Sequence, residues 1–209
     1  MLPDLISSIQ ILLQGELPGV EAQNRMTPAG RHPTSNYKPI PNPKQGAVLI
    51  LIRPTKDGFS FPVTQRPVHL NQHGGQISLP GGKVDLMDEN LFATALRETK
   101  EEIGIGGSSV KLLGALTPLY IPVSQFMVHP FVGFTDVVEK YSINSEEVGQ
   151  VSEIELSDLV DENNVGNGMF YLELLKKEFE MPCFNLNGLQ IWGATAMILS
   201  ELKVLMMRL

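Results

Sequence analysis

Residues 91–105, LFATALRETKEEIGI, constrain the fold most strongly because they combine a helical repeat of apolar residues with crowded acidic charge. Phe92, Leu96, Thr99 and Ile103 recur at i, i+4, i+7 and i+11, which is the spacing of one face of an α-helix. This segment is therefore predicted to be an amphipathic helix whose apolar stripe lies against the core.

Around this helix the sequence predicts strands separated by turns, without regular alternation of strand and helix. Strand-like runs occupy 46–53, 59–66, 75–80, 110–122, 127–138 and the start of 151–160. Asn187 and Gly188 indicate a two-residue hairpin turn within 179–191, and 192–209 has a helical apolar stripe. The pattern favours an α+β fold, an α/β/α sandwich with a mixed sheet between helices.

Length and composition favour one domain over residues 1–209, with an N-terminal helix at 4–14 and a proline-rich arm, together residues 1–45, packed on it. The net charge of −7 argues against a nucleic-acid partner. No apolar run approaches a membrane span, the N-terminus is a poor signal peptide, and the single Cys183 requires no oxidising compartment. A cytoplasmic protein is expected, with a homodimer as one option for assembly.

Three glutamates, Glu98, Glu101 and Glu102, share a sector beside the apolar stripe of the helix. Like charges at these spacings cost roughly 0.2–0.5 kcal/mol per exposed pair and more where water is partly excluded. Arg97 is expected to pair with Glu101 and to leave the others. A divalent cation would remove the penalty, and oxygen ligands favour Mg²⁺ or Mn²⁺. The alternative is a solvated acidic face.

A glycine pair, Gly81 and Gly82, stands shortly before the helix in the sequence SLPGG. Glycine lets the backbone turn sharply and approach a ligand or metal closely. We therefore expect a turn at these glycines, and the turn, the helix and the acids together favour a site for a metal-bound phosphate chain.

The stretch RETKEEIGI resembles the Nudix box, G-x5-E-x7-R-E-U-x-E-E-x-G-U with U aliphatic, which implies a Nudix fold. The matching residues are Arg97, Glu98, Glu101, Glu102, Gly104 and Ile105, with Thr99 in an aliphatic position. Upstream, the acid eight residues before Arg97 is Glu89, but Lys83 stands where the glycine is expected. Either the segment after Gly82 has one extra residue, or Asp88 takes the role of the acid. The partner of Arg97 is therefore Asp88 or Glu89.

The segment 64–82, TQRPVHLNQHGGQISLPGG, is similar to the one that precedes the box in the coenzyme A diphosphatase branch of this superfamily, and so is 191–199, IWGATAMIL. The chain keeps Thr64, Gly75, Pro80, Gly81 and Gly82 of the branch pattern. It replaces the branch arginine with Asn71, the phenylalanine with Leu79, and a leucine pair with Pro62 and Val63.

The resemblance also implies roles for individual residues. Metal ligands are expected to be Glu98, Glu101, Glu102 and the Gly82 carbonyl, and the catalytic residues Glu98, Glu101 and Arg97, with Arg97 orienting the glutamates by an ion pair. The expected substrate contacts are Arg66, Gly81 and His73. The alternatives are a surface charge for Arg66 and a structural, hydrogen-bonded role for His73. The general base is left open between Glu98 and the loop pair Glu146 and Glu147. Phe126 and Trp192 either stack on an adenine ring or pack in the core.

The expected reaction is Mg²⁺- or Mn²⁺-dependent hydrolysis of a diphosphate bond in a nucleoside diphosphate derivative. Coenzyme A or its thioesters, split into 3′,5′-ADP and a phosphopantetheine part, is the first choice. ADP-ribose, dinucleotides and similar compounds are alternatives of the same class. A catalytically silent nucleotide-binding regulator is the alternative of a different class.

Overall fold

The computed structural model describes residues 2–28, 38–67, 75–137, 140–172 and 176–209. His73 and residues 29–37 of the proline-rich arm lie outside this part of the chain. In chain order the elements are α1 (Leu2–Gln14), α2 (Gly19–Asn24), β1 (Lys44–Pro54), β2 (Phe59–Gln65), β3 (Ile77–Ser78), β4 (Gly81–Lys83), α3 (Leu91–Ile103), η2 (Gly107–Ser109), β5 (Lys111–Ala115), β6 (Leu119–Ile121), β7 (Phe126–Phe134), β8 (Gln150–Glu155), α4 (Leu156–Val160), η3 (Glu162–Asn164), β9 (Val165–Leu172), β10 (Lys177–Leu186), β11 (Leu189–Trp192) and α5 (Gly193–Met206).

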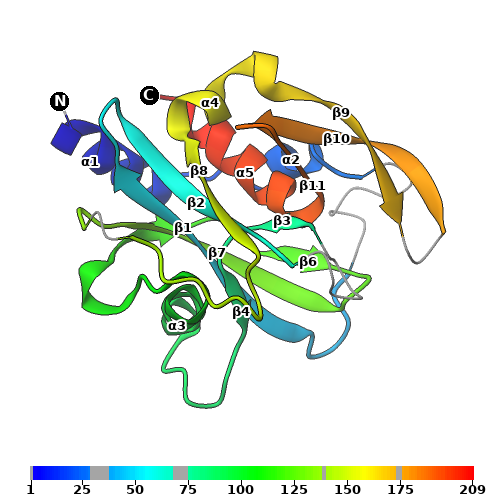
Figure 1. Ribbon diagram of the computed structural model, residues 1–209, viewed down its shortest axis with the longest axis horizontal. Helices are drawn as coiled ribbons and strands as arrows, with labels where there is room; N and C mark the ends of the chain where they lie inside the picture. The colour runs from blue at the N-terminus through cyan, green and yellow to red at the C-terminus, as the bar shows by residue number, and fades with distance from the viewer. Residues whose placement is uncertain (1, 29–37, 68–74, 138–139, 173–175) are drawn as a thin grey trace.

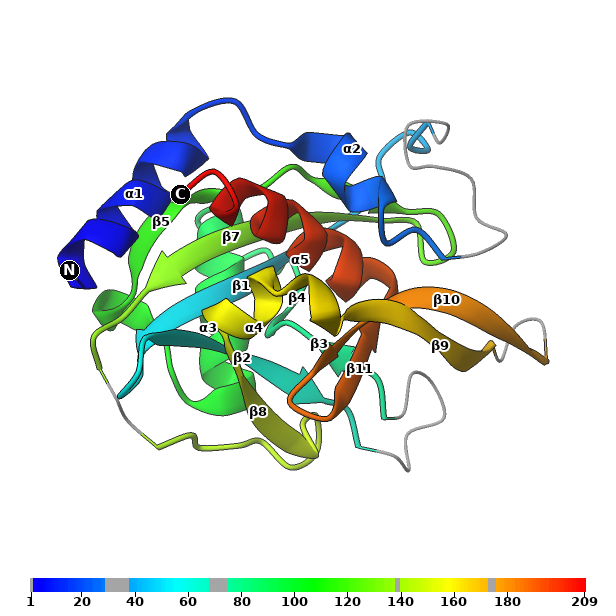
Figure 2. The ribbon, with the colours of Figure 1, turned by 90° about the horizontal axis from the view of Figure 1, so that it is seen from above.

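The main sheet is mixed, as predicted, and is organised around β1 and β7. These two strands run parallel from the pair Lys44 and Phe126 to the pair Ile52 and Phe134. The order of the central strands is β3-β2-β1-β7-β5, with β4 paired to β1, β6 to β7 and β8 to β2, all antiparallel. A second sheet has the order β11-β10-β9, and β9 and β10 extend away from the body of the molecule (Figures 1 and 2).

Helices cover both faces of the main sheet, which explains why β1 is a continuous apolar run. Successive side chains of a strand point to opposite faces. Ala47, Leu49 and Leu51 pack in the cluster beneath α3, whereas Ile50 and Ile52 belong to the larger core with α1 and α5. Figure 1 shows α3 on one side of the sheet and α5 with α2 on the other. The predicted α+β class with a sheet between helices is confirmed.

Local expectations with strong turn or periodicity signals are confirmed. β1 and β2 form the predicted hairpin, paired antiparallel next to its turn. Asn187 and Gly188, with φ of 49° and 74°, connect the paired residues Leu186 and Leu189 of the β10–β11 hairpin. Two positive φ values in a two-residue loop match the right-handed twist of the flanking strands.

Helix α2 and strand β9 are among the elements that were not predicted. Helix α2 lies within the proline-rich arm, where no helix was expected, and six residues are too few to show a helical repeat. It is held by Glu201 of α5, which is fully buried and accepts hydrogen bonds from Gly19 N, Gln23 Nε2 and the Thr117 hydroxyl. Strand β9 contains Gly166 and Gly168, which weaken the strand signal of its sequence.

Candidate functional site

The glycine pair lies in a strand and not in the expected turn. Gly81 and Gly82 belong to β4 and pair with Val48 and Ala47 of β1. Gly81 has φ of +151°, and a Cβ there would lie 2.3 Å from the Ala47 carbonyl oxygen. A Cβ on Gly82 would lie 2.4 Å from Cδ of Glu98. Both positions therefore require glycine, one to pair closely with β1 and the other to admit a carboxylate from α3.

Helix α3 begins and ends at residues that fix its position against β4. The Asn90 side chain caps its first turn by accepting a hydrogen bond from Ala93 N at 2.9 Å, and Gly104 ends it with φ of 79°. Thr99 and Ile103 of the predicted stripe are buried, and Phe92 and Leu96 pack against the core as partly buried residues. The glutamates consequently lie on the flank of α3 that faces β4.

Arg97 is paired with Asp88, which settles the choice that the sequence left open. Arg97 Nε donates to Asp88 Oδ1 at 2.9 Å and Nη2 donates to Oδ2 at 3.0 Å, a two-pronged ion pair. The Asp88 side chain is 5% exposed and also accepts hydrogen bonds from Asp85 N and the Thr94 hydroxyl. The Arg97 hydrogen bonds hold the pKa of Asp88 well below its usual range. Glu89 is exposed.

The same guanidinium also contacts two of the glutamates. Arg97 Nη1 lies 2.9 Å from Glu98 Oε1 and 3.0 Å from Glu101 Oε2, and Nη2 donates to the Lys83 carbonyl at 3.1 Å. The expectation that Arg97 pairs with Glu101 and leaves the others was therefore incomplete. The hydrogen bonds to Asp88, and after them the one to Glu98, raise the pKa of Arg97.

The three glutamates differ in their exposure to water. Glu102 is 7% exposed and accepts a hydrogen bond from Gly81 N at 3.3 Å, whereas the Glu98 and Glu101 side chains are 16% and 53% exposed. Burial, with a smaller contribution from the neighbouring Glu98 charge, raises the pKa of Glu102 to about 8. Burial also raises the pKa of Glu98. The site would hold all its carboxylates ionised at neutral pH if a cation were bound among them.

A loop of residues 142–149 brings a fourth acid to this site. Ser142 N and Asn144 N donate to the carbonyl oxygens of Ile103 and Glu102 at the end of α3, both at 3.0 Å. Repulsion from the Glu147 carboxylate contributes to the raised pKa values of both Glu98 and Glu102. The Glu147 charge therefore lies within reach of Glu98 and Glu102, although the sequence alone gave no reason to prefer it to Glu146.

Arg66 supplies positive charge on the same side. It directly follows β2, and its backbone exchanges hydrogen bonds with Gln76 O and Gly75 N at 3.1 Å. Its charge acts to lower the pKa of Glu102, which places the guanidinium near that carboxyl group. The structure thus brings together Gly81, Gly82, Arg97 and the three glutamates, with Arg66 and Glu147 beside them.

The oxygen donors suit a hard divalent cation, which prefers carboxylate and carbonyl ligands. Glu102 is buried with an unfavourable charge, and the absence of a side chain at Gly82 admits the Glu98 carboxylate. Across the described ranges, no three His, Cys, Asp or Glu side chains form a ready-made cation site, since Arg97 holds the oxygens of Glu98 and Glu101. The chemistry of the residues fits, and those two side chains would have to turn toward the ion.

Comparisons with known proteins identify the family. A model described as the NUDIX domain matches residues 43–173. The uncharacterized Nudix hydrolase NudL of Pectobacterium atrosepticum is 34% identical over 174 residues, covering 81% of this chain and 86% of that protein. The NudL protein of Citrobacter koseri is 41% identical over 118 residues, covering 56% of this chain and 60% of that protein. This chain belongs to the Nudix hydrolase family, which acts on nucleoside diphosphate derivatives and generally uses divalent metal ions.

Similar solved structures include an Ap4A hydrolase of C. elegans in a binary complex, with a TM-score of 0.46 and 21% identity, covering 56% of this chain and 83% of that one. Another is the NUDIX domain of Shewanella oneidensis NrtR bound to ADP ribose, with a TM-score of 0.47 and 19% identity, covering 60% and 82%. At such identities these likenesses carry no information on the ligand of this chain. In the described part of this protein, no helix is both long enough and apolar enough to span a membrane.

The ion pair between Asp88 and Arg97 gives a first prediction. Asp88→Asn should lower the free energy of unfolding by about 2 kcal/mol, because it removes a charged partner of Arg97 from a nearly buried position. Glu89→Gln, the matched change at the exposed neighbour, should alter it by less than about 0.5 kcal/mol. Urea unfolding of both variants measures these changes. Equal losses of unfolding free energy in the two variants would show that the ion pair of Asp88 with Arg97 does not stabilise the fold.

The raised pKa of Glu102 gives a second prediction, for protein kept free of divalent ions by a chelator. Since the folded-state pKa of about 8 lies above the ordinary 4.5, the unfolded chain loses this proton first as pH rises, and the folded state loses stability between these values. Glu102→Gln should therefore be more stable than the wild type at pH 8, on the order of a few kcal/mol, with the difference vanishing near pH 4.5.

Thermal melting from pH 4.5 to 8.5 measures this difference. Adding Mg²⁺ or Mn²⁺ should stabilise the wild type selectively, because the ion compensates the buried charge. A wild type as stable as Glu102→Gln at pH 8 without metal would contradict the assigned burial effect.

Proposed function

We propose that this protein hydrolyses the diphosphate bond of coenzyme A or acyl-coenzyme A, using Mg²⁺ or Mn²⁺, to give 3′,5′-ADP and the phosphopantetheine part. The observation that carries the proposal is the buried Glu102 carboxyl group, which accepts a hydrogen bond from Gly81 N of β4, next to the position where Glu98 approaches Gly82. Such a carboxyl group is well suited to hold a cation against a diphosphate. The coenzyme A assignment is supported by the branch residues Thr64, Gly75, Pro80, Gly81 and Gly82.

In this proposal Glu98, Glu101, Glu102 and the Gly82 carbonyl hold the metal. When bound, the metal neutralises diphosphate charge and lowers the pKa of a water molecule. Asp88 fixes Arg97, and Arg97 in turn orients Glu98 and Glu101.

The remaining side chains of the site act on the water and the substrate. Glu147 or Glu98 accepts the proton of the attacking water, because the two carboxylates are close enough for the Glu147 charge to raise the pKa of Glu98. Arg66 and Gly81, together with His73, contact the substrate phosphates.

ADP-ribose or another nucleoside diphosphate derivative is the second candidate substrate, favoured by Asn71 in place of the branch arginine. A catalytically silent regulator is a weaker candidate, because all three box glutamates are present. We further propose that residues 1–209 act as one domain in the cytoplasm, as a monomer or homodimer and without a nucleic-acid partner.

The test is a substrate panel with Mg²⁺ or Mn²⁺, in which coenzyme A, ADP-ribose, NADH and diadenosine polyphosphates are compared by product chromatography. Coenzyme A should give the highest kcat/KM, and a chelator or Glu102→Gln should abolish turnover. Preference for ADP-ribose would overturn the substrate and leave the reaction class standing. Absence of hydrolysis of every diphosphate would overturn the enzymatic function.

The loop acid gives a separate prediction. Glu147→Gln should lower kcat by about 10²-fold or more if its carboxylate accepts the proton of the attacking water, with little change in KM. Glu146→Gln, the adjacent exposed glutamate, is the matched control and should retain kcat. Equal kcat values for the two variants would leave Glu98 as the base.

A further inference from the structure

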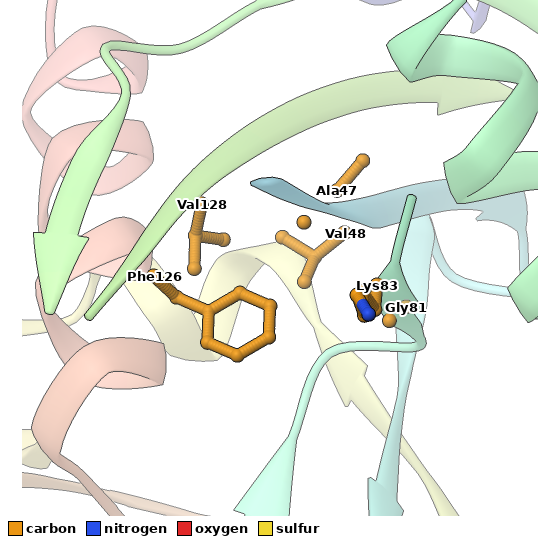
Figure 3. A pocket seen from close by; sticks show the side chains of 8 residues that line it. Ala47, Val48, Gly81, Lys83, Phe126 and Val128 are labelled. Carbon is orange, nitrogen blue, oxygen red and sulfur yellow. The ribbon is translucent and has the colours of Figure 1, made fainter. Parts of the chain in front are cut away.

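A small apolar cavity borders Gly81 and Gly82 on the main sheet (Figure 3). It has a volume of about 170 Å³, below the roughly 300 Å³ at which sites for whole ligands begin. Its lining consists of Gly46, Ala47, Val48, Gly81, Gly82, Lys83, Phe126 and Val128. We call this cavity the Phe126 slot. Its size suits one group of a substrate and not a whole nucleotide.

The slot shares Gly82 with the proposed metal site. A Cβ on Gly46 would lie 2.9 Å from the Gly82 carbonyl oxygen and 3.3 Å from Cδ1 of Phe126. The Phe126 ring and the carbonyl that we assign to the metal therefore both lie directly against the backbone of Gly46, where a side chain would collide with the carbonyl. In Figure 3 the ring of Phe126 and Val128 lie across the slot from Gly81 and Lys83. A group in the slot would be attached close to the bond that is cleaved.

The lining of the slot combines apolar walls with positive charge at the rim. Phe126, Val128 and Val48 contribute apolar side chains. Lys44 Nζ lies 5.6 Å from the centre of the Phe126 ring, and Lys83 lines the slot. Both lysines are exposed. This combination is complementary to a flat apolar group that carries phosphate next to it.

Resting on the proposed function, we propose that the Phe126 slot receives the adenine base of the nucleotide half of the substrate. The base packs against the Phe126 ring, and Lys44 and Lys83 face the phosphates of that half. Stacking of a base on an aromatic ring needs no base-specific hydrogen bond, which matches walls made of apolar side chains and backbone. A thiol or an acyl chain carries no charge that two flanking lysines would attract.

Phe126→Leu tests the proposal because it removes the aromatic ring and keeps an apolar side chain. Phe126→Tyr keeps the ring. Phe131→Leu is the matched control, since Phe131 belongs to the same strand but packs against Phe92 of α3, with ring centres 5.5 Å apart. Titration calorimetry with Mg²⁺ measures binding of 3′,5′-ADP, AMP and 4′-phosphopantetheine to each folded variant, independently of turnover.

We expect Phe126→Leu to weaken the binding of both adenine nucleotides by about 10-fold or more, because one stacking contact is lost. The affinity for 4′-phosphopantetheine should be unchanged. Phe126→Tyr and Phe131→Leu should bind all three like the wild type. The proposal would be overturned if Phe126→Leu weakened the binding of 4′-phosphopantetheine instead, or if Phe131→Leu lost as much nucleotide affinity. It would also be overturned if the wild type bound neither nucleotide. If ADP-ribose and not coenzyme A is the substrate, the AMP titration still decides the slot, because both substrates carry adenine.

Discussion

The ion pair between Arg97 and Asp88 supports the whole arrangement of acids. Without a fixed cation, the glutamates of α3 would repel one another beside a buried apolar face. Asp88 sits in a compact turn, and its hydrogen bonds to Asp85 N and Thr94 fix where the guanidinium is held. From that position Arg97 reaches both Glu98 and Glu101. The charges of Glu98 and Glu101 are therefore partly balanced in the folded chain, and their transfer from Arg97 to a divalent ion would be a local rearrangement.

The sheet positions these acids because the strand residues next to them are glycines. β1 is buried on both faces, so α3 has a fixed surface to lie on, and β4 at the edge of β1 contributes two residues without side chains. The missing Cβ atoms let Glu98 and Glu102 approach the backbone of β4. At Gly46 the missing Cβ likewise lets the Phe126 ring and the Gly82 carbonyl lie against the backbone of β1. Glycine on three neighbouring strand positions thus shapes both the proposed metal site and its proposed base subsite.

The sequence predicts the parts of the site that depend on local spacing. The register of Glu98, Glu101 and Glu102 follows from helical periodicity, and the β10–β11 turn follows from Asn187 and Gly188. It does not predict interactions made between distant segments. The choice of Asp88 over Glu89 depends on how the preceding turn folds, and Glu147 reaches the site because Asn144 binds the end of α3. The strand at Gly81 and Gly82 exists because β1 pairs with it, and glycine itself gives no strand signal.

The long parallel ladder between β1 and β7 has a consequence for the order of events in folding. Lys44 pairs with Phe126 and Ile52 with Phe134, so the central pairing joins segments that are far apart along the chain, and such contacts form slowly. All the acids of α3 precede β7 in the sequence, and so they are synthesised before the sheet that buries Glu102 can close. In the nascent chain these glutamates are solvated acids, and Glu98 and Glu102 acquire their raised pKa values only when the last central strand and the 142–149 loop have docked.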